Sequence, residues 1–284
     1  MFRSETSLVN VAFSARDAQG SLVPDLRADE LEVLENGLPR KIAFFSHSTG
    51  LPLTLGLVLD QSPSQDKYIK AHARDLQRFL TGLLTPSDRA FLVGFGDHIR
   101  LISDYTPAAA TLLWTLAHYQ RKYAYPELGP QLERDGGTAL FDALDAAVAQ
   151  KLRGQTGRRV LLVFSDGEDN SSAHDEGAVL AAAQDADVTI YTIRYLPDRR
   201  MTARDYYGTA VMQRLAGETG GQPVDAARIE PRQFFAVIAG ELRASYQLAY
   251  YPPSGAPPGF RAIQIRCTRP GITIQSRRGY TAQP

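Results

Sequence analysis

One short segment limits the folds available to this chain more than any other. Residues 53–59 read Leu-Thr-Leu-Gly-Leu-Val-Leu, an almost unbroken apolar run that stops at Asp60. Such a run is typical of a strand buried on both faces of a parallel sheet, which needs helices on both sides to cover it. The segment therefore predicts a central strand of an α/β domain.

The chain then alternates between helix and strand patterns as far as residue 245. Apolar residues at helical spacing cover 68–84, and residues 160–164 repeat the buried-strand pattern. The other expected elements are strands at 90–95, 99–103 and 188–193, and helices at 108–119, 139–151, 176–184, 207–219 and 231–244. This alternation predicts a doubly wound, mostly parallel central sheet with helices on both faces.

Both ends of the chain have strand patterns without a helical period. Three β segments precede the α/β block and three follow it, near residues 8–13, 31–34, 41–45, 246–251, 260–266 and 272–275. Two such small β units would each have too little core to be stable alone. We therefore expect segments 1–50 and 246–284 to pair as a discontinuous β-sandwich around an α/β domain at 51–245.

The charge of the chain is balanced overall but not along its length. The 284 residues hold 31 basic and 31 acidic side chains, so a general affinity for nucleic acid is not expected. Residues 1–50 are net acidic, whereas the last 39 residues hold five arginines and no acid: Arg261, Arg266, Arg269, Arg277 and Arg278. Two interpretations are open: these arginines point to solvent from alternating strands, or the two ends of the chain lie against each other.

Membrane segments and disulfides are not expected. No run approaches the roughly 18–20 apolar residues that span a bilayer. The first six residues lack the apolar core of a signal peptide, so we expect a cytoplasmic protein or a mature segment with a new initiator methionine. Cys267 is the single cysteine, which excludes an intramolecular disulfide and a cysteine-rich metal site.

Oxygen-bearing side chains gather in the loops that follow the buried strands. The first strand is followed by Asp-Gln-Ser-Pro-Ser at 60–64, the strand at 160–164 by Ser-Asp-Gly, and Gly-Gly-Thr at 136–138 precedes a helix. In open α/β sheets, ligands bind at the carboxyl ends of the strands, where these loops should meet. The candidate ligands are Asp60, Ser62, Ser64, Thr138 and Asp166.

These five side chains offer two carboxylates and three hydroxyls, and no soft ligand. An all-oxygen set suits a hard divalent cation such as Mg²⁺. Because only two formal negative charges face the cation, the site would favour one more carboxylate from outside. Each motif alone is more often a helix cap or a solvated turn, but all three in order at strand ends favour a metal site.

The same residues resemble the metal-ion-dependent adhesion site of von Willebrand factor type A domains. The resemblance covers about residues 51–245 and includes all five ligand positions in order, with Pro63 as a mild departure. It implies a Rossmann-like fold, Mg²⁺ with Mn²⁺ or Ca²⁺ as alternatives, and Asp166 as a direct or water-mediated ligand. It also implies a non-enzymatic adhesion or assembly module located outside the cytoplasm, whose cation is completed by an acidic residue of a partner protein.

The flanks carry a further resemblance. Val33-Leu34-Glu35-Asn36-Gly37 and Arg277-Arg278-Gly279-Tyr280 are similar to the segments that surround this domain in a group of acidobacterial von Willebrand A-related proteins. These flanks contain no residues with chemistry of their own.

Two other functions remain open from the sequence. A metal-assisted hydrolase of the phosphatase type would use Asp66, Glu168 or Asp169 as a base. The second alternative is a scaffold in an envelope complex that has the same fold but binds no metal. The five histidines show no metal-ligand spacing, and the chain has neither a nucleophile elbow nor a phosphate loop. The sequence defines neither the partner nor the oligomeric state.

Overall fold

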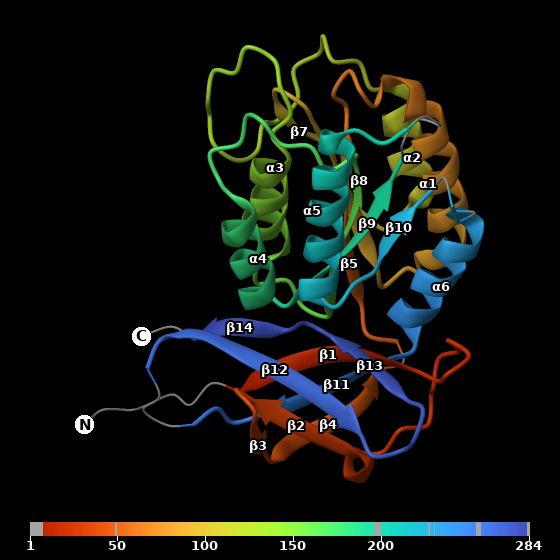
Figure 1. The fold of residues 1–284 in the computed structure, drawn as a ribbon. Coiled ribbons are helices and arrows are strands. Elements are labelled where there is room, and N and C mark those ends of the chain that lie inside the picture. Colours follow the sequence, from red (N-terminus) through yellow and green to blue (C-terminus); the bar gives the residue numbers. More distant parts are fainter. Residues whose placement is uncertain are drawn as a thin grey trace.

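The computed structural model consists of an α/β part and a β-sandwich stacked end to end (Figure 1). It describes residues 8–48, 50–195, 200–226, 228, 229, 231–253 and 257–282. The α/β part contains a six-stranded sheet of order β10-β9-β8-β5-β6-β7, in which every neighbouring pair is parallel except β6 and β7. Its strands are β5 (Leu53–Asp60), β6 (Arg89–Phe95), β7 (Ile99–Thr106), β8 (Arg158–Phe164), β9 (Val188–Arg194) and β10 (Pro223–Asp225). The predicted mostly parallel sheet is confirmed, with the apolar run as a central strand.

Helices cover both faces of this sheet. Buried side chains of α1, α2 and α6 pack on one face, and those of α3, η3, α4 and α5 pack on the other. The helices are α1 (Ile69–Leu83), α2 (Ala109–His118), α3 (Leu140–Ala146), the π-helix η3 (Ala147–Leu152), α4 (Glu176–Asp185), α5 (Ala203–Thr219) and α6 (Pro231–Arg243), with short 3-10 helices η1 (Ala28–Glu30) and η2 (Asp66–Tyr68). On α1, Leu76, Leu80 and Leu83 recur at helical spacing and are buried, as the amphipathic pattern requires.

Two helices differ from the sequence-based expectation. The helix expected at 139–151 changes from α-helix to π-helix at Ala147. Helix α5 begins at Ala203 rather than 207, because Thr202 and Asp205 form a reciprocal capping box that starts the helix four residues earlier.

The two ends of the chain form the β-sandwich. Its sheets have the orders β13-β1-β11-β4 and β14-β12-β2-β3, so each sheet combines strands from both ends. The strands are β1 (Val9–Arg16), β2 (Leu31–Glu35), β3 (Leu38–Arg40), β4 (Ile42–Ser48), β11 (Ser245–Tyr250), β12 (Gly259–Cys267), β13 (Thr273–Ser276) and β14 (Gly279–Ala282). The predicted discontinuous sandwich is confirmed. The expected three strands on each side were too few, because β3 and β14 are too short to show an alternating pattern.

Ion pairs join the two ends, as the second interpretation of the charge distribution proposed. Arg261 pairs with Glu35 at 3.0 Å, and Arg269 pairs with Asp25 and Glu30, each at 2.9 Å. The interpretation of the C-terminal arginines as solvent-facing is wrong for Arg261 and Arg277, which are 7% and 8% exposed. Both guanidinium groups can be buried because distant segments supply hydrogen-bond acceptors: the carboxylate of Glu35 for Arg261, and the carbonyl oxygens of Gln184 and Asn10 for Arg277.

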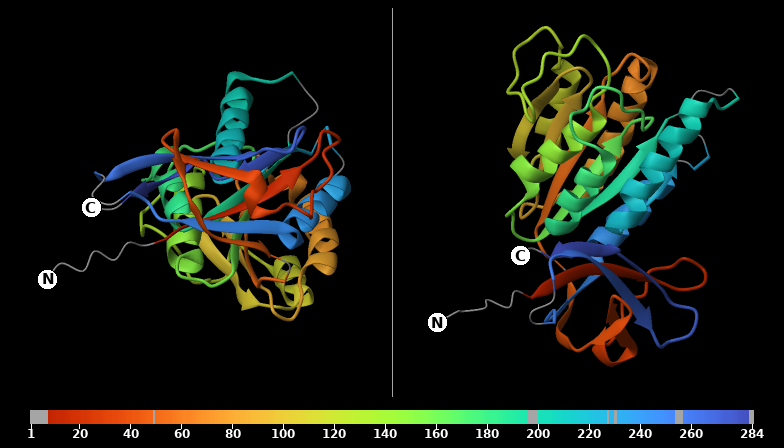
Figure 2. Two further views of the ribbon diagram at one scale, coloured as in Figure 1. Left: turned by 90° about the horizontal axis from the view of Figure 1, so that it is seen from below. Right: turned by 60° about the vertical axis from the view of Figure 1, so that its left-hand side comes forward.

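The α/β part is joined to the sandwich at one end only, by the connections from β4 to β5 and from α6 to β11 (Figure 2). The boundaries near residues 51 and 245 stay a prediction. Within the described residues, no helix combines the length and apolar character that crossing a membrane requires.

Candidate functional site

The loops after β5 and β8 lie at the end of the α/β part that faces away from the sandwich (Figure 1). β5 and β8 are parallel neighbours in the middle of the sheet, and the chain continues from them in opposite directions, to β6 and to β9. They therefore flank the topological switch point, where ligand sites of open α/β sheets form. Asp60 ends β5, and Asp166 follows β8 by two residues.

Hydrogen bonds connect the side chains of these two loops. Ser64 Oγ donates to Asp166 Oδ2 at 2.7 Å and lies 3.1 Å from Ser62 Oγ. The backbone N–H of Ser62 donates to Asp60 Oδ1 at 2.9 Å. Asp60, Ser62 and Asp166 are buried, whereas Ser64 is exposed. The structure thus brings four of the five predicted ligands into one cluster of oxygen atoms at the sheet edge.

The carboxylates of Asp60 and Asp166 repel each other within this cluster. Burial, followed by the negative charge of Asp166, raises the pKa of Asp60 to about 6. Hydrogen bonds from Ser165 and Ser62 offset part of this effect. A positive charge next to both carboxylates would relieve the same repulsion, so the electrostatics of the cluster fit a cation.

Thr138, the fifth predicted ligand, is linked to the cluster less directly. Its backbone N–H donates to Asn170 Oδ1 at 2.8 Å, and the N–H of Asn170 donates back to the carbonyl of Thr138 at 3.1 Å. In the described part of the chain, no hydrogen bond joins its hydroxyl to the other four. The preceding Gly137 has φ +97°, and a Cβ atom there would lie 2.7 Å from Asn170 Oδ1. Glycine therefore lets this loop approach the loop after β8.

Two residues that the sequence analysis missed support the carboxylates. Ser165 is fully buried and donates to Asp60 Oδ2 at 2.6 Å, while its own Oγ accepts from the N–H of Gly167 at 3.1 Å. Gln65 is also buried and donates to Asp166 Oδ2 at 2.8 Å, leaving its Oε1 without a hydrogen-bond partner. The sequence indicated these two residues only by their position next to predicted ligands, and this signal is weak because serine and glutamine are common in loops.

Asp142 organises the loops around the cluster. This buried carboxylate accepts from the N–H groups of Ala173 and His174 at 3.0 and 2.9 Å, and it pairs with Arg134 and with the ring Nδ1 of His174. Burial raises its pKa, but these hydrogen bonds outweigh burial and hold the pKa below its ordinary value. One carboxylate on α3 therefore ties together loops 121–137 and 167–175.

A cavity of about 140 Å³ opens beside the cluster. Its lining includes Ser62, the paired glycines at 136 and 137, and the arginines Arg100 and Arg121, with Asp97 as an acidic neighbour. Arg121 is already engaged with Asp66 at 2.9 Å. The cavity is large enough for a carboxylate side chain and reaches Ser62, one of the predicted ligands, from outside.

All three carboxylates considered as catalytic bases, Asp66, Glu168 and Asp169, take part in interactions within the protein. Asp66 pairs with Arg121, and Asp169 Oδ1 accepts from Ser172 Oγ at 2.6 Å and from the N–H of Phe141 at 3.2 Å. These contacts hold the two carboxylates in interactions within the loops themselves and with helix α3. The arrangement offers oxygen ligands and a place for an incoming anion more readily than an acid–base pair.

The donor set limits what the site can hold. The five predicted ligands offer oxygen atoms alone, which suits Mg²⁺, Mn²⁺ or Ca²⁺. Among the described residues, no group of three or more His, Cys, Asp or Glu side chains is arranged to hold a metal. A cation at this position would therefore depend on the hydroxyl groups of Ser62, Ser64 and Thr138 and on a further ligand.

Comparisons with known proteins agree with the fold of the α/β part. Residues 55–230 match the von Willebrand factor type A domain. An aerotolerance-related membrane protein from Bacteroides fragilis is similar at a TM-score of 0.51 and 18% identity, over 67% of this chain and 98% of that one. Proximal thread matrix protein 1 from the mussel byssus is similar at 0.53 and 13%, over 74% and 51%. At these identities the likeness shows the fold alone. No curated protein matches the chain.

Proposed function

Because this chain belongs to the von Willebrand factor type A domain family, whose members are generally protein-interaction or adhesion modules, we propose that it binds a partner protein through a divalent cation. Asp60, Ser62, Ser64, Thr138 and Asp166 would hold the cation, with Mg²⁺ favoured and Mn²⁺ or Ca²⁺ as alternatives. An acidic side chain of the partner would complete its coordination.

The cluster of oxygen atoms after β5 and β8 carries this proposal. Ser62, Ser64 and Asp166 are already joined by hydrogen bonds, so few side chains must be reordered to accept a cation. The cation supplies a positive charge for the partner's carboxylate. Because only two carboxylates face the site, that charge is not cancelled and attracts a third.

The cavity lined by Ser62 and Gly137 provides the entry for the partner's side chain. Loop 121–137 contributes Arg121, Gly136 and Gly137 to the lining of this entry, and Asp142 fixes loop 167–175 in position beside it. These loops would therefore set which partner fits. A catalytic role is not part of the proposal, since Asp66 and Asp169 serve other partners.

The remaining expectations belong to this proposal. We place the protein outside the cytoplasm, in an assembly or adhesion complex, as its resemblance to von Willebrand factor type A adhesion domains suggests.

Calorimetric titration with Mg²⁺, Mn²⁺ and Ca²⁺ is the first test, and affinity capture from native lysate with and without chelator is the second. Asp60→Ala should abolish cation binding and capture, and chelation should abolish capture by the unmodified chain. Asp66→Asn removes a carboxylate from the same loop and serves as the matched control, with binding retained. Capture that survives both chelation and Asp60→Ala would refute the proposal, and Asp60-dependent turnover of phosphate or ester substrates would favour the hydrolase.

A further inference from the structure

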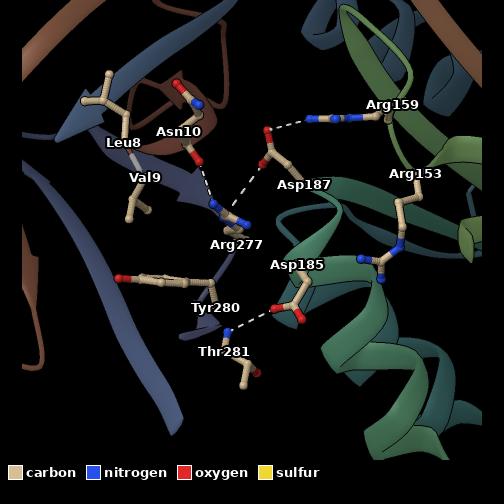
Figure 3. A pocket seen from close by; sticks show the side chains of 10 residues that line it. All are labelled: Leu8, Val9, Asn10, Arg153, Arg159, Asp185, Asp187, Arg277, Tyr280 and Thr281. Atoms are coloured by element: carbon tan, nitrogen blue, oxygen red, sulfur yellow. Dashed lines mark hydrogen bonds and ion pairs between the residues drawn. The ribbon is translucent and has the colours of Figure 1, made fainter. Parts of the chain in front are cut away.

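A second cavity lies at the other end of the α/β part, where it meets the sandwich (Figure 3). We call it the seam cavity; its volume is about 610 Å³. The α/β part contributes Arg153, Arg159, Asp185 and Asp187 to its lining, from the amino-terminal edge of β8 and β9. The sandwich contributes Leu8, Val9, Asn10, Arg277, Tyr280 and Thr281.

Positive charge is in excess on this lining. Arg159 and Arg277 share one carboxylate, that of Asp187, at 3.3 and 3.7 Å. Arg153 is exposed and has no ion pair among the residues that the structure describes. Asp185 is the second carboxylate, and it accepts from the N–H of Thr281 at 3.1 Å. Three guanidinium groups thus face two carboxylates.

The conformation of the turn before β9 fixes this arrangement. Asp187 has φ +51°, in the left-handed region that aspartate adopts more readily than most residues. The turn directs its carboxylate between Arg159 and Arg277, which come from the two different parts of the chain. Figure 3 shows the three side chains meeting at the cavity wall.

Arg159 and Arg277 are held in fixed positions in the cavity lining. Arg277 is 8% exposed; its terminal nitrogen atoms donate to the carbonyl oxygens of Gln184 and Asn10, and its Nε lies 3.7 Å from Asp187 Oδ1. Arg159 donates to the carbonyl oxygen of Gln155 and to the carboxylate of Asp187, each at 3.3 Å. The two guanidinium groups are therefore preorganised for an anion in the cavity.

We propose that the seam cavity binds a small organic oxyanion, one that presents a phosphate group or several carboxylates. Guanidinium groups form paired, charge-assisted hydrogen bonds with such oxygen atoms. The volume falls within the range of small-molecule sites and exceeds what a lone phosphate needs, so the anionic group belongs to a larger molecule. Because the lining comes from both parts of the chain, the ligand stabilises the joint between them.

The test uses inorganic phosphate and citrate as probes, with thermal unfolding and calorimetry as readouts. The protein is first freed of divalent cations by passage over a chelating resin, so that no soluble chelator competes with the probes, and sodium chloride of equal ionic strength is the reference. We expect a saturable rise in the unfolding midpoint and one bound anion per chain. The two probes distinguish phosphate recognition from polycarboxylate recognition.

Arg153→Gln should weaken binding about tenfold, the loss of one charge-assisted contact. Since Arg153 is exposed and has no ion pair among the described residues, this variant should fold normally. Arg159→Lys keeps the positive charge but loses the two parallel N–H donors of the guanidinium group, and its affinity for the probes is the second measurement. Arg266→Gln, an exposed arginine outside the cavity, is the matched control and should bind as the unmodified chain does. A midpoint rise equal to that in chloride, or one unchanged by both cavity variants, would overturn the proposal.

Discussion

Arg16 and Glu241 form an ion pair of 2.7 Å across the junction of the two parts of the protein. Glu241 belongs to α6, the last helix of the α/β part, and its side chain is fully buried; Arg16 ends β1 of the sandwich. The same carboxylate accepts from Gln222 Nε2 at 2.7 Å and from Tyr191 Oη at 3.1 Å. One buried charge therefore connects the sheet, the last helix and the sandwich.

The first prediction concerns this buried charge. Glu241→Gln should lower the free energy of unfolding by about 3 kcal/mol, because it removes the fully buried counter-charge of the half-buried Arg16. Denaturant unfolding measures the change. Arg278→Gln, which removes an exposed pair with Glu218, should change the free energy by less than about 1 kcal/mol. Equal effects of the two variants would contradict the role assigned to Glu241.

The second prediction concerns Ser165, which positions a proposed ligand without being one. Ser165→Ala removes the hydrogen bond to Asp60 Oδ2 and should weaken Mg²⁺ binding roughly tenfold. The fold should persist, as circular dichroism would verify. Calorimetric titration gives the affinity, and an unchanged dissociation constant would show that this hydrogen bond does not orient Asp60 for the cation.

The third prediction compares two adjacent glycines. Gly136 and Gly137 both have positive φ, but a Cβ atom at 136 meets nothing within 4 Å, whereas one at 137 lies 2.7 Å from Asn170 Oδ1. Both alanine variants should lose about 1 kcal/mol of stability to backbone strain. Gly137→Ala should additionally weaken cation and partner binding, because the loop that carries Thr138 must move. Equal binding by the two variants would refute this difference.

The fourth prediction concerns stability in acid. Burial raises the pKa of Asp88, but hydrogen bonds from Arg243, from Thr85 and from the N–H of Leu53 outweigh it, and the pKa lies below its ordinary value of 3.8. A depressed pKa stabilises the folded state above pH 3.8, and this contribution is lost as the pH falls through the folded-state value.

Asp88→Asn should therefore cost stability near pH 7 and much less near pH 2, where the unmodified protein has lost the same contribution. Urea unfolding at several pH values measures the difference between the two chains. A difference that stays constant down to pH 2 would show that the Asp88 carboxylate is not the acid-sensitive group.

Local patterns predicted much of the architecture. The apolar run ending at Asp60 placed β5 in the centre of a parallel sheet, and the strands at both ends predicted a shared sandwich, because neither end could bury a core alone. Short elements were missed, since β3, β10 and β14 have three or four residues each and show no period. The metal role of the five ligand positions stays a prediction, although four of them lie in one cluster.

The residue pattern alone was enough to predict the α/β fold, the sandwich built from both ends and the loops that carry the candidate ligands. Periodicity and turn residues are local properties that can be read along the chain. The contacts of Ser165 with Asp60, of Asp142 with two loops, and of Arg16 with Glu241, 225 positions away, became evident from the three-dimensional packing only. The seam cavity also belongs to this second group. Such contacts depend on how separate elements pack, because burial and charge balance are set by neighbours in space.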